Sequence, residues 1–311
     1  MKLDAMARVS RSGVRWGPVG VFLLLAFGLS WACFVGLRLV GLPFTVRATA
    51  GMFGPAAAAL LLRWGSGEGL RGLGLWPRWG WAYLWAYLLP ILLFGAAVAL
   101  ALAARYQRWD LLGNWQSVLD ATLRAAGPEA AASLRRLPGL LLGVQVLQAL
   151  TVGVLVSCIA TLGEELGWRG DLLPRLAPLG GTVAAVAVGV IWGLWHAPVI
   201  ALDGYEFGIR SWSVAPFFCL FTVPLAVILA WLRFRSGSVW PCVLMHAGVN
   251  AVAGLVLLAL SRPSSALIGA PVGLLGVTPF WALAAWLVIT GRLRPPEAPA
   301  PAGTTATLRG G

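Results

Sequence analysis

The residues best suited to chemistry in this chain are its only two histidines, His196 and His246, and two adjacent glutamates, Glu164 and Glu165. All four lie within long apolar stretches or at the end of one. Ionisable side chains at bilayer depth are costly, so they are functional candidates by default. Their joint placement predicts a single site in which carboxylates and imidazoles act together.

The glutamates begin the motif Glu-Glu-x-x-x-Arg, residues 164–169. On a helix, Glu165 and Arg169 are four residues apart, with the glutamate nearer the N-terminus, so they can form an ion pair. Glu164, rotated by about 100° around the helix, is then left without a local partner, and such a carboxylate suits a general base. The alternative is a helix end at the headgroups, capped by both glutamates.

Each histidine also has a partner at helical spacing. His196 follows Trp192 by four residues, and Asn250 follows His246 by four. The second pair places an imidazole and a carboxamide on one helix face, about 6 Å apart, where two neutral donors could stabilise a developing oxyanion. Either histidine could instead be a packing contact between helices. If none of the three motifs were catalytic, three separate structural roles would have to coincide and to use every histidine in the chain. This coincidence is a poor explanation, so the motifs together favour catalysis.

The composition places these motifs in a membrane. Of 311 residues, 59% are hydrophobic and 11% are charged, whereas soluble domains are about a quarter charged. Apolar runs long enough to cross a hydrocarbon core of about 30 Å recur along the chain. We predict an all-α polytopic membrane bundle of about eight transmembrane helices, with seven or nine as alternatives: 17–41, 48–63, 81–104, 138–163, 182–201, 213–232, 238–260 and 269–291.

The net charge of +12 comes from arginines at the segment ends, not from one basic stripe, so we expect no nucleic-acid partner. By the positive-inside rule, both termini are expected to be cytoplasmic. The segment 105–137 would then be external although it is basic, and it is long enough to form its own interfacial helix. The arginine-rich, almost lysine-free composition favours an integral protein of a prokaryotic plasma membrane.

The order of the motifs resembles the CAAX protease and bacteriocin-processing family of intramembrane endopeptidases, and is similar to its type II CAAX prenyl endopeptidases. That family has Glu-Glu-x-x-x-Arg, aromatic-x-x-x-His and His-x-x-x-Asn on successive helices. The flanking sequence 167–176 and the run Trp195-His196-Ala-Pro are also similar, and the resemblance covers about 155–255. The family usually has Phe where this chain has Trp192, which we expect to serve as an equivalent packing ring.

The resemblance implies a hydrolytic site with three kinds of residue. Glu164 and His196 would activate the water. His246 and Asn250 would donate hydrogen bonds to the oxyanion, and Glu165 and Arg169 would form a supporting pair. It implies a peptide or protein substrate at the membrane, in a cavity reached from the cytoplasm. The sequence does not identify that substrate or the oligomeric state.

A metal cofactor is the weak point of this assignment. Glu164, His196 and His246 could hold Zn²⁺ with one position open. However, asparagine is not a usual zinc ligand and no His-Glu-x-x-His helix is present. We therefore favour metal-free, glutamate-dependent hydrolysis, with zinc as the alternative.

The domain organisation follows from the distribution of these motifs. We predict N-terminal transmembrane helices and an interfacial connector in 1–137, a catalytic helical core in 138–260, a C-terminal transmembrane helix in 261–294 and a disordered tail in 295–311. The competing class is a non-enzymatic membrane protein, either a bacteriocin immunity factor or a transporter with a Glu/His relay. A relay would spread ionisable residues along a path, whereas here they cluster.

Helix depth presents a difficulty for a shared site. At about 1.5 Å per residue, His246 would lie roughly 12 Å from the cytoplasmic end, His196 roughly 21 Å and Glu164 only about 8 Å. Convergence would then require helix tilt or a re-entrant turn. Two prolines and two glycines between the fourth and fifth segments could supply such a turn: Pro174, Pro178, Gly180 and Gly181.

Overall fold

The computed structural model describes residues 13–126 and 138–295, and within these ranges it contains helices and no β-strand. Seven helical stretches are long and apolar enough to cross a membrane. The predicted all-α membrane bundle is therefore confirmed. The eighth predicted segment corresponds to α15, whose 16 residues span only about 24 Å.

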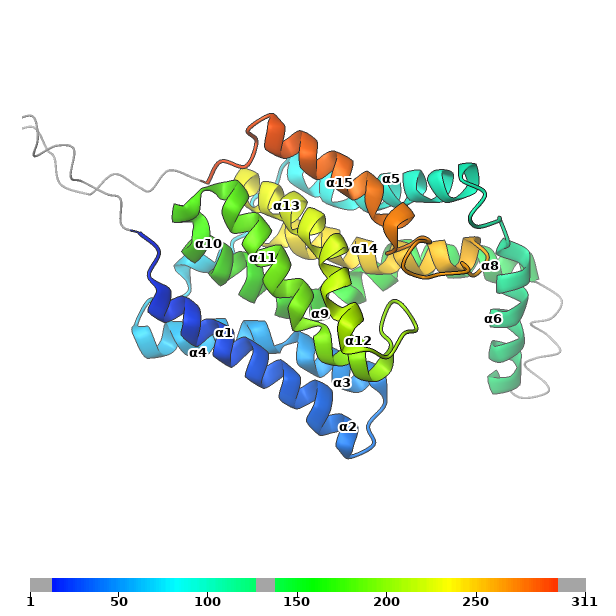
Figure 1. The fold of residues 1–311 in the computed structure, drawn as a ribbon, viewed down its shortest axis with the longest axis horizontal. Helices are drawn as coiled ribbons and strands as arrows, with labels where there is room; N and C mark the ends of the chain where they lie inside the picture. The colour runs from blue at the N-terminus through cyan, green and yellow to red at the C-terminus, as the bar shows by residue number, and fades with distance from the viewer. Residues whose placement is uncertain (1–12, 127–137, 296–311) are drawn as a thin grey trace, which may run out of the picture.

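The helices follow one another along the chain as Figure 1 labels them. Their bounds are α1 Trp16–Trp31, α2 Leu37–Leu39, α3 Phe44–Met52, α4 Gly54–Ser66, α5 Trp81–Ala103, α6 Leu111–Ala126, α8 Pro138–Gln148, α9 Val154–Glu165, α10 Leu173–Leu176, α11 Gly181–Trp195, α12 Ala197–Asp203, α13 Cys219–Ser236, α14 Trp240–Ala259 and α15 Leu274–Ile289.

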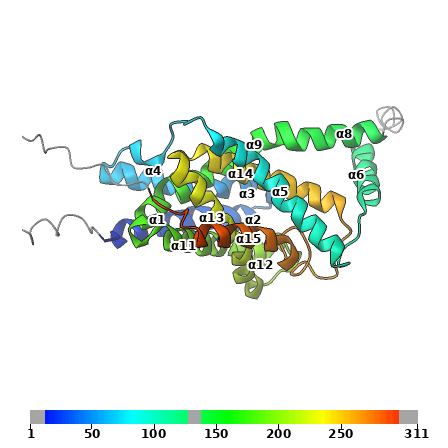
Figure 2. The same ribbon diagram turned by 90° about the horizontal axis from the view of Figure 1, so that it is seen from above.

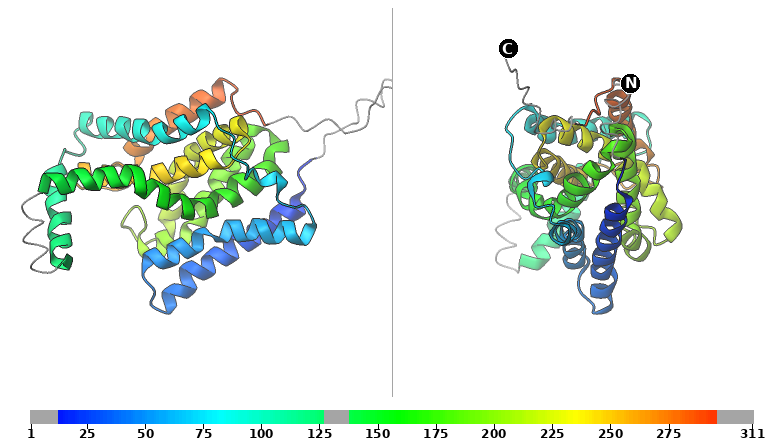
Figure 3. Two further views of the ribbon diagram at one scale, coloured as in Figure 1. Left: turned by 180° about the vertical axis from the view of Figure 1, so that it is seen from behind. Right: turned by 90° about the vertical axis from the view of Figure 1, so that its left-hand side faces the viewer.

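Within the bundle, α14 packs against α5 and α9, while α13 packs between α11 and α15. The pair α1 and α4 covers the side next to α9 and α11 (Figures 1 and 2). Residues 13 and 295 lie at the same end of the bundle (Figures 1 and 3). The described part of the chain does not include residues 1–12. It also does not include the predicted tail 295–311, except for residue 295.

The predicted interfacial helix in 105–137 corresponds to α6, which stands across the end of the bundle (Figure 1). Trp115, Leu119 and Leu123 recur at helical spacing and form a small apolar cluster with leucines of α8 and α14. This one-sided apolar stripe is typical of a helix that lies on a surface. Residues 127–137 lie outside the described part of the chain.

The fourth span differs from its prediction. Instead of ending at residue 163, the helix continues through the two glutamates to Leu179, giving 42 residues from Pro138. A π-helical stretch, Leu166–Leu172, follows Glu165 directly and joins α9 to α10. Such π-helical turns are rare and occur frequently at functional sites. The glutamates therefore lie inside a long helix and not at its end.

This correction removes the depth difficulty. Glu164 is 15 residues before Leu179, and His196 is 15 residues after Gly181, where α11 begins. Both lie about 22 Å from the reversal between the helices, so neither helix tilt nor a re-entrant turn is needed to bring these two residues to one level. The start of α14, which carries His246, is covered by the loop before α5: Val239 is fully buried and donates its N–H to Gly74 O at 3.0 Å.

Close packing of α11 on α13 positions the first histidine. A side chain at Gly189 would meet Val223 Cα at 2.6 Å, and one at Gly193 would meet Thr222 Oγ1 at 2.6 Å. Thr222 Oγ1 also donates a hydrogen bond to Gly189 O at 2.9 Å. Small residues and hydroxyl groups are the usual means by which membrane helices approach closely. The contact fixes the α11 helix whose C-terminal end leads into His196.

Candidate active site

Glu165 is the carboxylate that joins the first and third motifs. Arg169 Nη1 donates a hydrogen bond to Glu165 Oε1 at 2.8 Å, and His246 Nδ1 lies 2.9 Å from the same oxygen. All three side chains are buried. Because Glu165 Oε1 already accepts from Arg169, we take the Nδ1 of His246 as the atom that carries the hydrogen of this contact. The pairing at i and i+4 is therefore present, and it includes a histidine from another helix.

Glu164 has a partner that the sequence did not indicate. Trp192 Nε1 donates a hydrogen bond to Glu164 Oε2 at 2.6 Å, across α11 and α9. Glu164 is only 2% exposed. The sequence indicated only that Glu164 has no partner on its own helix and that Trp192 is a packing ring. In the structure Trp192 also donates its indole N–H, which satisfies a buried oxygen of Glu164.

Trp192 contacts Glu164, Arg169 and both histidines of the site. The Arg169 guanidinium carbon lies 4.5 Å from the Trp192 ring centroid, a cation–π distance. The His246 ring packs edge-on against the indole, with centroids 5.1 Å apart. The Trp192 carbonyl oxygen also accepts a hydrogen bond from the ring of His196. Trp192 therefore connects Glu164 with both histidines.

His196 is held in one tautomer. Its Nδ1 lies 2.8 Å from Trp192 O, and a backbone carbonyl can only accept a hydrogen bond. Nδ1 therefore carries the hydrogen, and the neutral ring leaves Nε2 free to accept a proton. Tyr205 stacks on the imidazole with an interplanar angle of 4°, and Phe218 meets it edge-on at 4.9 Å. These contacts orient the ring while leaving it neutral.

A cavity of about 110 Å³ lies beside the two histidines. Since a single water needs only about 10–15 Å³ of such space, it has room for several waters. Its lining includes Trp192, His196, Tyr205, Glu206, His246 and Asn250. The structure thus brings both histidines and the asparagine to one cavity. Neither Glu164 nor Glu165 lines it, because these glutamates lie behind the side chains that do.

The position of the cavity follows from the loops that line it. Tyr205 and Glu206 follow α12, and Val272, which also lines the cavity, precedes α15. These loops lie at the far ends of α11–α12 and α14, because both begin at the end of the bundle where residues 13 and 295 lie (Figure 1). The cavity therefore lies towards the end of the bundle opposite to residues 13 and 295.

Possible metal ligands do not converge in this arrangement. Within residues 13–126 and 138–295, no three His, Cys, Asp or Glu side chains are grouped as a metal site. The alternative zinc ligands Glu164, His196 and His246 therefore do not form a ready ligand set here.

Glu206 is a cavity residue that the sequence analysis missed. It is a third carboxylate beside the histidines, and its φ of +64° lies in the left-handed region, which is strained for a residue other than glycine. Burial raises the pKa of the Glu206 carboxyl, and a hydrogen bond from Tyr205 partly opposes that rise. The only signal was an acidic residue between Gly204 and Gly208, soon after the second motif.

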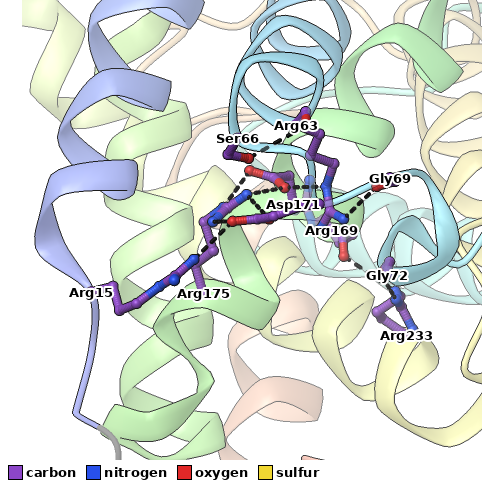
Figure 4. Close-up of polar contacts among 10 residues, drawn as sticks. Arg15, Arg63, Ser66, Gly69, Gly72, Arg169, Asp171, Arg175 and Arg233 are labelled. Atoms are coloured by element: carbon purple, nitrogen blue, oxygen red, sulfur yellow. Dashed lines mark hydrogen bonds and ion pairs between the residues drawn. The ribbon is translucent and has the colours of Figure 1, made fainter.

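A buried ion-pair network holds the π-helical stretch against α4. Asp171 is fully buried and accepts from Arg63 Nε at 2.6 Å and Arg175 Nε at 2.7 Å (Figure 4). Arg175 and Arg15 both pair with Glu68, at 2.7 and 2.8 Å. The N-terminal helices therefore help to position the segment that carries the two glutamates.

Residues 146–252 match the model of a family described as type II CAAX prenyl endopeptidase Rce1-like. The predicted resemblance is confirmed. The matched Rce1-like segment contains all six proposed site residues, together with Trp192 and Glu206. It excludes α1–α6 and α15.

A protein from Methanococcus maripaludis named CAAX prenyl protease 2 is also similar. It is 29% identical over 97 residues, which are 30% of this chain and 36% of that protein. The similarity thus spans about a third of the relative's length. It agrees with the family match of the Rce1-like segment. The activity and the substrate have to be inferred from the site.

Proposed function

We propose that this integral membrane protein is an intramembrane endopeptidase that hydrolyses a peptide bond in a membrane-associated peptide or protein. The proposal rests on the meeting of His196, His246 and Asn250 at one cavity that has room for several waters. Buried glutamates contact the residues around it. The arrangement lies within the Rce1-like segment, and the similar Methanococcus maripaludis protein is named a CAAX prenyl protease.

The proposed reaction begins with a water in the cavity. The Glu164 carboxylate removes one proton while His196 Nε2 accepts a hydrogen bond from the other hydrogen, and the water oxygen attacks the carbonyl carbon of the scissile bond. The carbonyl oxygen becomes an oxyanion. The tetrahedral intermediate then collapses, the C–N bond breaks, and the proton passes to the departing amine.

The oxyanion would be stabilised by His246 and Asn250. Because Nδ1–H of His246 donates to Glu165, Nε2 carries a hydrogen only when the ring is protonated. Glu165 compensates that charge, so the donor would be an imidazolium and not the neutral donor expected from spacing. The Asn250 carboxamide, one turn later on α14, would supply the second hydrogen bond.

Glu164 needs access to the water to take part. A general base must come within hydrogen-bonding distance of the proton that it removes, and Trp192 lies between this carboxylate and the cavity. We propose that the Trp192 side chain moves when substrate binds and brings Glu164 into contact with the water.

We also propose a prokaryotic plasma-membrane location with both termini in the cytoplasm. The support is the arginine-rich end of the bundle, where Arg15, Arg63, Arg78, Arg235 and Arg292 lie near the ends of the described chain. Cytoplasmic loops of membrane proteins carry such an excess of positive charge. The cavity would then face the opposite side.

Cleavage of quenched fluorescent peptides by purified protein in detergent would test the proposal. Wild type, Glu164→Gln and His196→Ala would be compared with Glu68→Gln, which changes a glutamate outside the site. The proposal predicts cleavage that both site variants lose, that Glu68→Gln keeps and that a chelator leaves intact. Chelator-sensitive cleavage would assign Glu164, His196 and His246 to a metal. Absence of cleavage by wild type would favour the immunity-factor or transporter class.

A further inference from the structure

The arginines at the end of the bundle near residues 13 and 295 fall into two sets. In the first set, Arg15, Arg63 and Arg175 form ion pairs with two carboxylates, those of Glu68 and Asp171 (Figure 4). In the second set, Arg78, Arg235 and Arg292 form no ion pair with any residue of 13–126 or 138–295. The two sets differ in counter-charge although they lie at the same end.

The second set lines a groove, here called the basic groove. It encloses about 360 Å³ and is bounded by Arg78, Arg235 and Arg292 together with Trp81, Trp85 and Trp231. An adjoining cavity of about 470 Å³ shares Trp231, Arg235 and Arg292 and adds Arg294. The groove is thus a continuous hollow where the start of α5 meets the ends of α13 and α15.

A further cation lies beneath the groove. Arg233 is buried, and its guanidinium donates only to backbone carbonyls, of Arg169 at 3.2 Å and Gly72 at 3.3 Å (Figure 4). Like charges held close together at the edge of a low-dielectric bundle repel one another unless an anion lies between them. The groove therefore has an excess of positive charge that no described carboxylate offsets.

We propose that the basic groove binds the phosphate headgroup of an anionic phospholipid. Guanidinium groups bind phosphate oxygens in a bidentate manner, and basic pockets between membrane helices are typical sites for anionic headgroups. Tryptophans prefer the headgroup level of the bilayer, so the three indoles place the groove there. The arginines would hold the phosphate, and the indoles would contact the start of the acyl chains.

The test is lipid binding by the purified full-length protein in detergent, followed by native mass spectrometry. Phosphatidylglycerol and phosphatidylcholine with identical acyl chains would be titrated in parallel. We expect wild type to prefer phosphatidylglycerol by about tenfold, since each arginine near the surface favours anionic lipid. The variant Arg78→Gln/Arg235→Gln/Arg292→Gln should lose this preference.

Two control variants distinguish loss of the basic groove from a general loss of positive charge and from misfolding. Arg108→Gln/Arg124→Gln/Arg262→Gln removes the same charge from exposed arginines elsewhere and should keep the preference. Arg78→Lys/Arg235→Lys/Arg292→Lys keeps the groove charge and should retain most of it. A preference that survives in the glutamine groove variant, or that is absent in wild type, would overturn the proposal.

Inorganic phosphate distinguishes a lipid from a free anion. If millimolar phosphate raised the melting temperature of wild type as much as phosphatidylglycerol does, and only through the groove arginines, the site would bind free phosphate and the lipid assignment would be wrong. We expect phosphate alone to have little effect, because it makes no contact with the indoles.

Discussion

Trp192 Nε1 donates to Glu164 Oε2 at 2.6 Å, so a residue one turn before the first histidine holds the first glutamate of the site. The same indole packs against His246 and lies over the Arg169 guanidinium. The three motifs are therefore joined through one side chain. This hydrogen bond both satisfies Glu164 and keeps it from the cavity.

Replacing the indole N–H should show which effect dominates. In Trp192→Phe the aromatic ring remains, but Oε2 of Glu164 loses its donor and gains space towards the cavity. We expect the turnover of a cleaved peptide to rise severalfold, because exposing the carboxylate no longer requires this hydrogen bond to break. Steady-state kinetics would measure the change.

Trp195→Phe is the matched control. Trp195 is also buried at the end of α11, but its Nε1 has no hydrogen-bond partner among the described residues. Its replacement should leave turnover close to wild type. Loss of cleavage in Trp192→Phe with normal thermal stability would show instead that the N–H holds Glu164 in its working position.

Glu165 pairs with both Arg169 and His246, so variants at this position should affect stability and activity differently. Glu165→Gln leaves the fully buried Arg169 without its carboxylate, and breaking a buried pair on one side costs about 3–5 kcal/mol. In Glu165→Gln/Arg169→Met both charges are absent, so most of that stability should return. Thermal unfolding in detergent would measure both variants.

Cleavage should not return in the double variant. His246 still lacks the carboxylate that accepts from Nδ1 and compensates a protonated ring. A double variant that is both stable and fully active would contradict the role given to Glu165. His246→Ala, which should be inactive while folded, provides the reference for complete loss.

The network around Asp171 gives a pH dependence outside the membrane spans. The hydrogen bond from Arg175 holds the pKa of Glu68 below its usual value. A carboxyl with a lowered pKa stabilises the fold above its unfolded pKa, and this contribution is lost as the pH falls through the folded pKa. The contribution of such a partly exposed pair is about 1 kcal/mol or less.

Wild type and Glu68→Gln should therefore differ in melting temperature at pH 7 and converge below about pH 4, in the range of an unperturbed carboxyl. The comparison removes the effects of all other groups that titrate in both proteins. A difference that stays constant down to pH 3 would show that Glu68 contributes no charge-dependent stability.

The sequence predicted what depends on spacing within one helix. The i and i+4 relation of Glu165 to Arg169, the shared face of His246 and Asn250 and the apolar spans all follow from helical periodicity. It did not predict that the fourth helix continues to Leu179. The polar residues after Glu165 looked like a helix end, and Asp171 can be buried there because Arg63 from another helix pairs with it in addition to Arg175.

Contacts between helices were also beyond the sequence. The bond from Trp192 to Glu164 joins residues 28 positions apart, and the spacing within either motif carries no information about it. Glu206 enters the cavity through a loop whose left-handed conformation has no sequence signature in a glutamate. Both contacts depend on how α9, α11 and the loop after α12 come together.

Glu206 leads to a prediction about substrate preference. Its carboxylate lines the cavity, and no arginine among the described residues forms an ion pair with it. We expect peptides with a lysine near the scissile bond to be cleaved faster than otherwise identical peptides with glutamine there. Glu206→Gln should remove this preference, and Glu206→Lys should reverse it in favour of glutamate.

The preference should depend on pH in a defined direction. Burial raises the pKa of Glu206, so the carboxyl is neutral at low pH and attracts a lysine only as the pH rises through that raised value. His196, His246 and Tyr205 also face the cavity, but their titration should affect both peptides of a matched pair. The ratio of kcat/KM for the lysine peptide to that for the glutamine peptide therefore isolates Glu206. It should increase with pH in wild type and stay flat in Glu206→Gln; a ratio that falls with pH would assign the preference to another group.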